Sequence, residues 1–267
     1  MIEGVKHIVA VASGKGGVGK STVTANLALA MAAEGYRVGL LDADIYGPSQ
    51  ARMLGIGEGV RPQMAGENSF KPLEAHGIQA MSMAFMVDIN EPMVWRGPMV
   101  AGAFQQLLNQ TAWDNLDYLF IDMPPGTGDI QLTLAQKVPV SGAVIVTTPQ
   151  DIALLDARKG IEMFRKVNVP VLGIVENMSL HVCSNCGHGE PIFGEGGGDR
   201  IARQYDTQLL GQLPLQLSIR EQADGGIPSV VAEPEGEIAT TFRNVARSVV
   251  KGVESQSDEG PSISFGD

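Results

Sequence analysis

The nine residues 14–22, GKGGVGKST, constrain the fold of this chain more than any other segment. They match the phosphate-binding loop pattern G-x-x-x-x-G-K-[ST] and add a second lysine directly after the first glycine. Glycines let the backbone curl so that its N–H groups converge on phosphate oxygens, which a Cβ would obstruct. The predicted nucleotide-binding residues of this loop are Gly14, Lys15, Gly16, Gly17, Val18, Gly19, Lys20, Ser21 and Thr22.

The segments on either side of the loop support a nucleotide site. Residues 8–12 are a short apolar run that predicts a buried strand, and residues 20–34 predict a helix that ends at Gly35. Strand, glycine loop and helix N-terminus in this order place a phosphate at the positive end of the helix dipole. Lys20 is then expected to contact the outer phosphates, and the Ser21 hydroxyl to ligate Mg²⁺.

Composition limits the class of protein. A length of 267 residues with 44% hydrophobic and 18% charged residues fits one large globular α/β domain, expected over residues 1–253. Residues 254–267 are polar and acidic and predict a disordered tail. A net charge of -11 argues against nucleic acid or a membrane as partner. Two cysteines and no export signal indicate a reducing compartment, so a cytoplasmic protein is expected.

Further apolar, β-branched runs alternate with helical patterns along the chain. Strands are predicted at residues 38–41, 118–121, 143–147 and 171–175, and a helix at residues 152–167. This alternation predicts an α/β fold with a doubly wound, mostly parallel sheet and helices on both faces, as in P-loop NTPases. Ligands of such sheets bind at the carboxyl ends of the strands, so the polar residues just after each strand are the candidates for chemistry.

Two of the predicted strands lead directly into aspartates. Asp42 and Asp44 follow the strand at 38–41, where a carboxylate would position the attacking water or assist Mg²⁺; the alternative is that they cap a turn. Asp122 follows the strand at 118–121, which is the Walker B arrangement that supports Mg²⁺. The stiff Pro-Pro-Gly that comes next places the N–H of Gly126 to sense a γ-phosphate.

A second constellation lies at Cys183 and Cys186, the two cysteines of the chain, at the spacing that lets two thiolates hold one metal or cluster. A full site needs about four ligands. His181 and His188 would complete a mononuclear zinc site, whereas a twofold homodimer would supply two thiolates from each subunit. Four thiolates suit an iron–sulfur cluster and Zn²⁺ about equally, and a thioredoxin-like redox pair would normally open a helix.

Taken together, these residues resemble one family. The doubled-lysine loop is similar to the deviant Walker A group of P-loop ATPases, which includes the nitrogenase iron protein, MinD and ParA. Within that group the chain resembles the Mrp-type iron–sulfur cluster carriers at five places. They are the loop itself, LDADIYGPS at 41–49, WRGPM at 95–99, DMPPGTGD at 122–129, and ENMS at 176–179 with the cysteines that follow.

The resemblance implies an enzyme that binds and slowly hydrolyses ATP with Mg²⁺. Lys15 would reach across a homodimer to the partner's nucleotide, and Lys20, Ser21 and Thr22 would contact the phosphates and Mg²⁺. With Lys15 and Lys20, the third catalytic residue would be Asp44, which orients the hydrolytic water.

The same resemblance implies that Asp122 supports Mg²⁺ and that Asn177 contacts the adenine. Cys183 and Cys186 would share a bridging [4Fe-4S] cluster with their counterparts and pass it to apo iron–sulfur proteins.

Two other functions stay open from the sequence. One is a partitioning or positioning ATPase like ParA or MinD, although the acidic C-terminal end and the C-x-x-C pair do not fit it. The other keeps the homodimer but places structural Zn²⁺ at Cys183 and Cys186.

Overall fold

The computed structural model describes residues 2–66, 68–86, 97–183 and 185–258, so Trp95 and Arg96 of the WRGPM segment lie outside the described residues. Its centre is an eight-stranded sheet in the order β10-β7-β6-β1-β5-β2-β4-β3, in which only β3 runs antiparallel to its neighbour. The strands are β1 (Val5–Ala12), β2 (Val38–Asp42), β3 (Leu73–Ala75), β4 (Ile78–Ser82), β5 (Leu116–Asp122), β6 (Gly142–Thr147), β7 (Val171–Glu176) and β10 (Leu209–Gln212).

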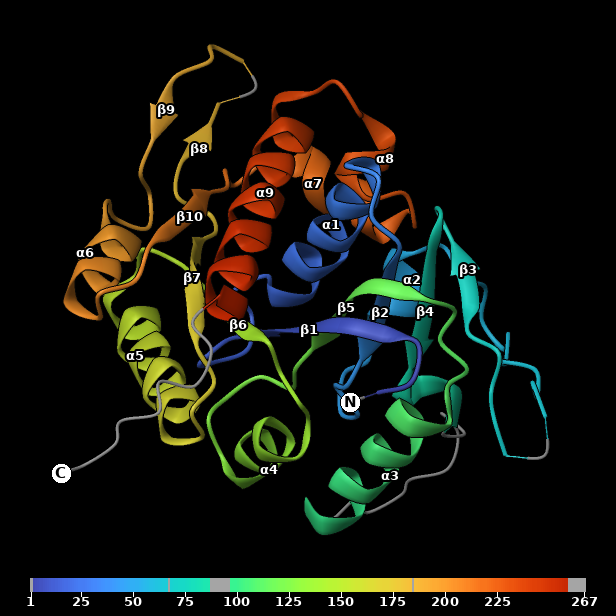
Figure 1. Ribbon diagram of the computed structural model, residues 1–267. Helices are drawn as coiled ribbons and strands as arrows, with labels where there is room; N and C mark the ends of the chain where they lie inside the picture. The colour runs from blue at the N-terminus through green and yellow to red at the C-terminus, as the bar shows by residue number, and fades with distance from the viewer. Residues whose placement is uncertain (1, 67, 87–96, 184, 259–267) are drawn as a thin grey trace, which may run out of the picture.

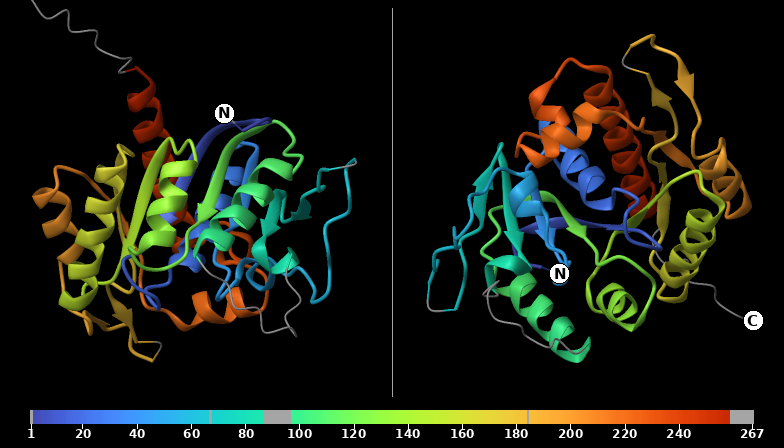
Figure 2. Two further views of the ribbon diagram at one scale, coloured as in Figure 1. Left: turned by 90° about the horizontal axis from the view of Figure 1, so that it is seen from below. Right: turned by 180° about the vertical axis from the view of Figure 1, so that it is seen from behind.

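Helices cover both faces of this sheet (Figures 1 and 2). The alternation of side chains along β1 divides the core, because Val9 and Val11 face one hydrophobic cluster while Ile8 and Ala10 face the other. The first cluster lies under α1 (Lys20–Ala33), α8 (Ser229–Ala232) and α9 (Glu237–Asp258), and the second under α3 (Gly97–Gln110), α4 (Asp129–Lys137) and α5 (Asp151–Lys166).

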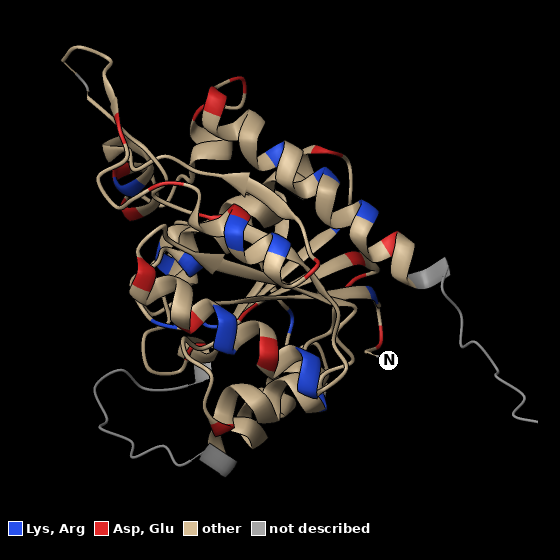
Figure 3. Ribbon diagram, turned by 90° about the vertical axis from the view of Figure 1, so that its left-hand side faces the viewer, with Lys and Arg blue, Asp and Glu red and all other residues tan. Residues whose placement is uncertain are grey.

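Shorter helices and strands complete the fold. They are α2 (Gln50–Met53), the 3-10 helix η1 (Met83–Met86), the hairpin strands β8 (His181–Val182) and β9 (Gly189–Glu190), α6 (Gly197–Gln204) and α7 (Leu217–Asp224). Within the described residues, no helix combines the length and the apolar character that crossing a membrane requires. On the side of the molecule drawn in Figure 3, basic and acidic residues are mixed along α5 rather than separated.

The predicted fold class is confirmed. The five predicted strands lie within β1, β2, β5, β6 and β7, and the two predicted helices correspond to α1 and α5. Gly35 closes α1 as expected, with a positive φ of 94° and its N–H donated to the carbonyl of Ala32 over 2.9 Å.

The predicted boundary at residue 254 needs correction. Helix α9 continues to Asp258, because its apolar stripe, which includes Phe242, Val249 and Val253, is buried in the cluster that also contains α1. Disorder is therefore wrong for residues 254–258, where an amphipathic helix carries polar residues past its last buried side chain. For residues 259–267, which lie outside the described residues, it stays a prediction.

Candidate functional site

The glycine loop between β1 and α1 lines an open pocket of about 270 Å³ at the carboxyl edge of the sheet. Gly16 and Gly17 are exposed, and a Cβ added at either would meet nothing within 4 Å. Their backbone is therefore open to a ligand, as a phosphate cradle requires. The lining residues are Ser13, Lys15, Gly16, Gly17, Gly19, Lys20, Ser21, Thr22, Asp44, Ser49, Met53 and Pro125.

Two other glycines of the loop are required by packing. A Cβ on Gly14 would lie 2.1 Å from the carbonyl oxygen of Asp156, so the start of the loop rests against the backbone of α5. A Cβ on Gly19, whose φ is +83°, would lie 2.2 Å from Nδ2 of Asn177 just after β7. The sequence analysis attributed these glycines to phosphate binding alone, because the contacts come from segments more than 100 residues away.

Lys20 lies at the base of the pocket in a buried ion pair with Asp122 of β5. Its Nζ also lies 3.3 Å from the Ser21 hydroxyl, and the Thr24 hydroxyl donates to Oδ1 of Asp122 over 3.2 Å. The predicted phosphate-binding lysine, the predicted Mg²⁺ ligand Ser21 and the Walker B carboxylate are thus brought together. Hydroxyl and carboxylate oxygens are the donors that Mg²⁺ prefers, so the residues present fit this ion.

Asp42 is the buried anchor of the loop that follows β2. Its side chain accepts the backbone N–H groups of Asp44, Ser49 and Gln50 over 3.0–3.1 Å. Burial, together with the neighbouring charge of Asp122, raises the pKa of Asp42 to about 7. This carboxyl group therefore fixes the loop and does not face the pocket.

Asp44 borders the pocket and also stabilises the turn that follows β2. It lines the pocket, and its Oδ1 accepts the N–H groups of Tyr46 and Gly47, each over 3.2 Å. One carboxylate oxygen thus stabilises the turn while the side chain borders the space where a phosphate would lie.

Gly126 and Asn177 both contact segments of the glycine loop. The N–H of Gly126 donates to the carbonyl of Ser13 over 2.9 Å, so sensing a γ-phosphate requires this bond to break first. Asn177 donates from Nδ2 to the carbonyl of Val18 over 2.9 Å, which ties the end of β7 to the loop. Its predicted contact with adenine stays a prediction.

Cys183 and Cys186 lie in the short hairpin formed by β8 and β9. The N–H of Cys183 donates to the carbonyl of His188, and the N–H of Gly187 donates back to the carbonyl of Cys183, both over 2.9 Å. Cys183 is half-buried and Cys186 is exposed. Hydrogen bonds from the backbone N–H groups of Asn185 and Cys186 lower the pKa of the Cys183 thiol, which favours the thiolate that binds metals.

The hairpin does not complete a metal site by itself. In the part of the chain that the structure describes, no group of three or more His, Cys, Asp or Glu side chains is arranged to hold an ion. His188 is exposed, while His181 approaches the carbonyl of Leu215 with its Nδ1 over 3.3 Å. Within the described residues, the two cysteines and the two histidines are thus not gathered into one mononuclear zinc set.

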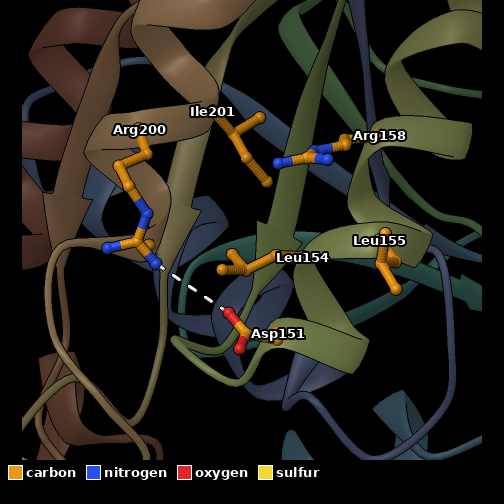
Figure 4. Close-up of a pocket in the computed structure, with 7 residues that line it drawn as sticks. Asp151, Leu154, Leu155, Arg158, Arg200 and Ile201 are labelled. Atoms are coloured by element: carbon orange, nitrogen blue, oxygen red, sulfur yellow. Dashed lines mark ion pairs between the residues drawn. The ribbon is translucent and has the colours of Figure 1, made fainter.

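A second pocket of about 240 Å³ lies between α5 and α6, and none of its lining residues is a predicted site residue (Figure 4). Arg158 and Arg200 extend toward it from the two helices, and Arg200 lies 4.0 Å from Asp151. Leu154, Leu155, Gly197 and Ile201 complete its lining.

Sequence reasoning missed two side chains that hold the Walker B carboxylate. They are Thr24, one turn into α1, and Gln50, the first residue of α2. Neither belongs to a motif, and only the pairing of β2 with β5 places Gln50 beside Asp122.

Most of the chain matches one known protein family. Residues 4–250 match the model of the family described as ParA: NUBPL iron-transfer P-loop NTPase. The chain belongs to this family. It is similar to the iron-sulfur cluster carrier protein of Pseudomonas fragi, with 67% identity over 249 residues that cover 93% of this chain and 87% of the relative. It is also similar to the iron-sulfur cluster transfer protein NUBPL of Mus musculus, with 52% identity over 95% of this chain and 80% of that relative.

Solved structures agree with this family. A nucleotide-binding protein from Archaeoglobus fulgidus, solved in complex with ADP, superimposes with a TM-score of 0.77 at 38% identity, covering 90% of this chain and 93% of that chain. The cell division ATPase MinD of Pyrococcus furiosus shares the fold. It superimposes with a TM-score of 0.68 at 24% identity and covers 92% of this chain and 98% of that chain.

Proposed function

We propose that this chain is an ATP-hydrolysing carrier that holds an iron–sulfur cluster between two copies and delivers it to apo-proteins in the cytoplasm. The observation that carries the proposal is the coexistence, in one member of the iron-transfer family, of an open phosphate pocket and a hairpin that presents two thiols. The name of the Pseudomonas fragi relative, an iron-sulfur cluster carrier protein, supports it.

At the nucleotide end, each residue has a defined task. The backbone of Gly16 and Gly17 cradles the phosphates, and Lys20 exchanges Asp122 for the outer phosphates when ATP enters. Ser21 and Asp122 would hold Mg²⁺, and the ion would supply positive charge beside the phosphates. Asp44 orients the water that attacks the γ-phosphorus, and the bond to the leaving ADP breaks.

At the cysteine end, the ligand count favours a homodimer. Cys183 and Cys186 of two copies give the four thiolates that a [4Fe-4S] cluster takes. Lys15 lines the pocket beside the exposed glycines of the loop. We assign its ammonium to the partner's nucleotide, and the Asn177 amide to the adenine of its own.

The decisive experiment is anaerobic reconstitution with iron and sulfide, followed by visible absorption, elemental analysis and sedimentation. The wild-type chain should give a dimer with four iron and four sulfide per two chains, as one [4Fe-4S] cluster requires. Cys183→Ser and Cys186→Ser should each lose iron at least about tenfold, because each removes two of the four ligands. His188→Ala, which changes an exposed neighbour, serves as the matched control and should retain its iron.

Three outcomes separate this function from others. Iron that survives the loss of both cysteines would overturn the cluster site. Zinc in place of iron in protein prepared anaerobically would indicate a structural zinc dimer. Transfer of the cluster to an apo-ferredoxin, followed by circular dichroism with and without ATP, tests the delivery step.

A further inference from the structure

Gln50 lies against Asp122 and Ser21 behind the nucleotide pocket, and the proposed function assigns it no role. It is 1% exposed, and it begins α2 directly after the loop that carries Asp44. Its Nε2 donates to Oδ2 of Asp122 over 2.8 Å and to the backbone carbonyl of Ser21 over 2.9 Å. One amide group therefore contacts the Walker B carboxylate and the first turn of α1 at the same time.

The orientation of this amide is fixed by chemistry. Both neighbours are acceptors, so the amide must turn its NH₂ group toward them, and the flipped orientation would set oxygen against two oxygens. The consequence is that Oε1 of Gln50 is buried and has no hydrogen-bond partner among the residues that the structure describes. A buried acceptor without a partner is costly, so the two donated bonds dominate the placement of this side chain.

The two oxygens of Asp122 are held differently. Oδ1 takes the Lys20 ammonium and the Thr24 hydroxyl, whereas Oδ2 takes Gln50. When Lys20 leaves for the phosphates, Oδ1 gains a free position while Gln50 keeps its hydrogen bond to Oδ2. The contact of Gln50 with the carbonyl of Ser21 fixes the other Mg²⁺ ligand relative to this carboxylate.

The backbone of Gln50 adds a connection to the loop after β2. Its N–H donates to Oδ2 of Asp42 over 3.1 Å, and the N–H of Ser49 donates to the same oxygen over 3.0 Å. The residue that holds Asp122 and Ser21 is thus anchored by the carboxyl group that also shapes the turn of Asp44.

We propose that Gln50 is a positioning residue for Mg²⁺: its amide holds Asp122 and Ser21 in the relative placement that the ion needs beside bound nucleotide. The inference rests on the proposed nucleotide function. It assigns Gln50 no contact with the ATP phosphates, so its removal should affect the contribution of the metal and leave binding of the nucleotide itself intact.

The test measures the affinity of a fluorescent N-methylanthraniloyl ADP for the full chain with Mg²⁺ and with EDTA. In wild-type protein the affinity should rise when Mg²⁺ is present. Gln50→Met keeps the size of the side chain and removes both donated hydrogen bonds. We expect it to reduce the Mg²⁺-dependent gain about tenfold, because bonds to a charged partner contribute strongly, and to leave the affinity in EDTA within about twofold.

Two further variants make the result specific. Gln50→Glu places a carboxylate against Asp122 and the Ser21 carbonyl and should remove the Mg²⁺-dependent gain entirely. Gln106→Met, on the exposed surface of α3, is the matched control and should behave as wild type. Thermal unfolding of each variant, with and without Mg²⁺–ADP, checks that the fold persists.

The outcomes are distinguishable. If wild-type protein does not bind the nucleotide at all, the proposed function fails. If wild-type protein binds with a clear Mg²⁺ effect and Gln50→Met shows the same effect, the role of Gln50 is overturned. Equal weakening with Mg²⁺ and with EDTA would also overturn it, because a purely structural role predicts that pattern.

Discussion

The glycine loop and the cysteine hairpin of this chain are built in opposite ways. At the base of the loop, the charged groups of Lys20 and Asp122 are buried and held by hydrogen bonds from the chain itself. The hairpin consists of two-residue strands with one half-buried and one exposed cysteine. Buried charges held in place before a ligand arrives are typical of a site that acts chemically on its ligand, which is the role proposed for the phosphate pocket. The cysteine hairpin, which is proposed to release its cluster, instead lies at the surface and provides two of the four thiolates.

Loss of the buried Lys20 ammonium should have the largest effect, and it tests whether the buried charges at the base of the glycine loop stabilise the protein. Lys20→Met leaves the Asp122 carboxylate buried without its counter-charge, so we expect the free energy of unfolding to fall by about 3 kcal/mol or more. Binding of ATP should weaken about a hundredfold, because charge-assisted bonds to the phosphates are lost. Urea unfolding and nucleotide titration measure the two effects.

Lys159→Met is the matched control for this variant. Its ion pair with Asp156 lies at the surface, where the Lys159 side chain is 66% exposed, so the expected cost is below about 1 kcal/mol. Equal costs for the two lysines would show that the interior pair is not the stabilising element that its burial indicates.

A pair of glycine substitutions compares the two regions directly. Gly19→Ala should cost about 3 kcal/mol, because alanine is strained at a φ of +83° and its Cβ also displaces the Asn177 amide. Gly187→Ala, at a φ of +71° in the hairpin, meets nothing within 4 Å and should cost about 1 kcal/mol. Denaturant unfolding of both variants gives the comparison, and a larger cost at Gly187 would contradict it.

The smallest expected effect concerns the hairpin thiols in metal-free protein. Backbone hydrogen bonds lower the pKa of Cys183, so more of it is thiolate at neutral pH and its alkylation should begin at lower pH than that of an ordinary cysteine. Iodoacetamide labelling at a series of pH values, read at each site by mass spectrometry, measures the midpoint. The same protein unfolded in urea is the reference, and an identical midpoint in both states would contradict the prediction.

Local pattern predicted much of this molecule. The glycine loop, the strands before Asp42 and Asp122, and the glycine that closes α1 are all determined by residues close in sequence, so composition and spacing were enough to find them. The disorder predicted from residue 254 was wrong for residues 254–258, because the end of α9 depends on how far its packing against α1 supports the chain.

Contacts between distant segments account for the rest. Gln50 has no sequence signal because its role arises only when β2 pairs with β5 and brings the start of α2 to Asp122. Gly14 was explained by phosphate binding, although the backbone of Asp156 in α5 also requires it. Spacing likewise could not show how His181 and His188 lie relative to the two cysteines, because that depends on the fold of the hairpin.

The hydrogen bond from Asn177 to the carbonyl of Val18 links the glycine loop to the segment that leads to the cysteine hairpin. From Asn177, five residues, 178–182, lead to Cys183, and the first of them, Met178, is held at a φ of +57°. We expect a displacement of Val18 to reach the base of the hairpin through these five residues, because Asn177 at their start is bonded to the glycine loop. Inserting residues into the segment 178–182 should leave the glycine loop and the hairpin folded and remove the coupling between them.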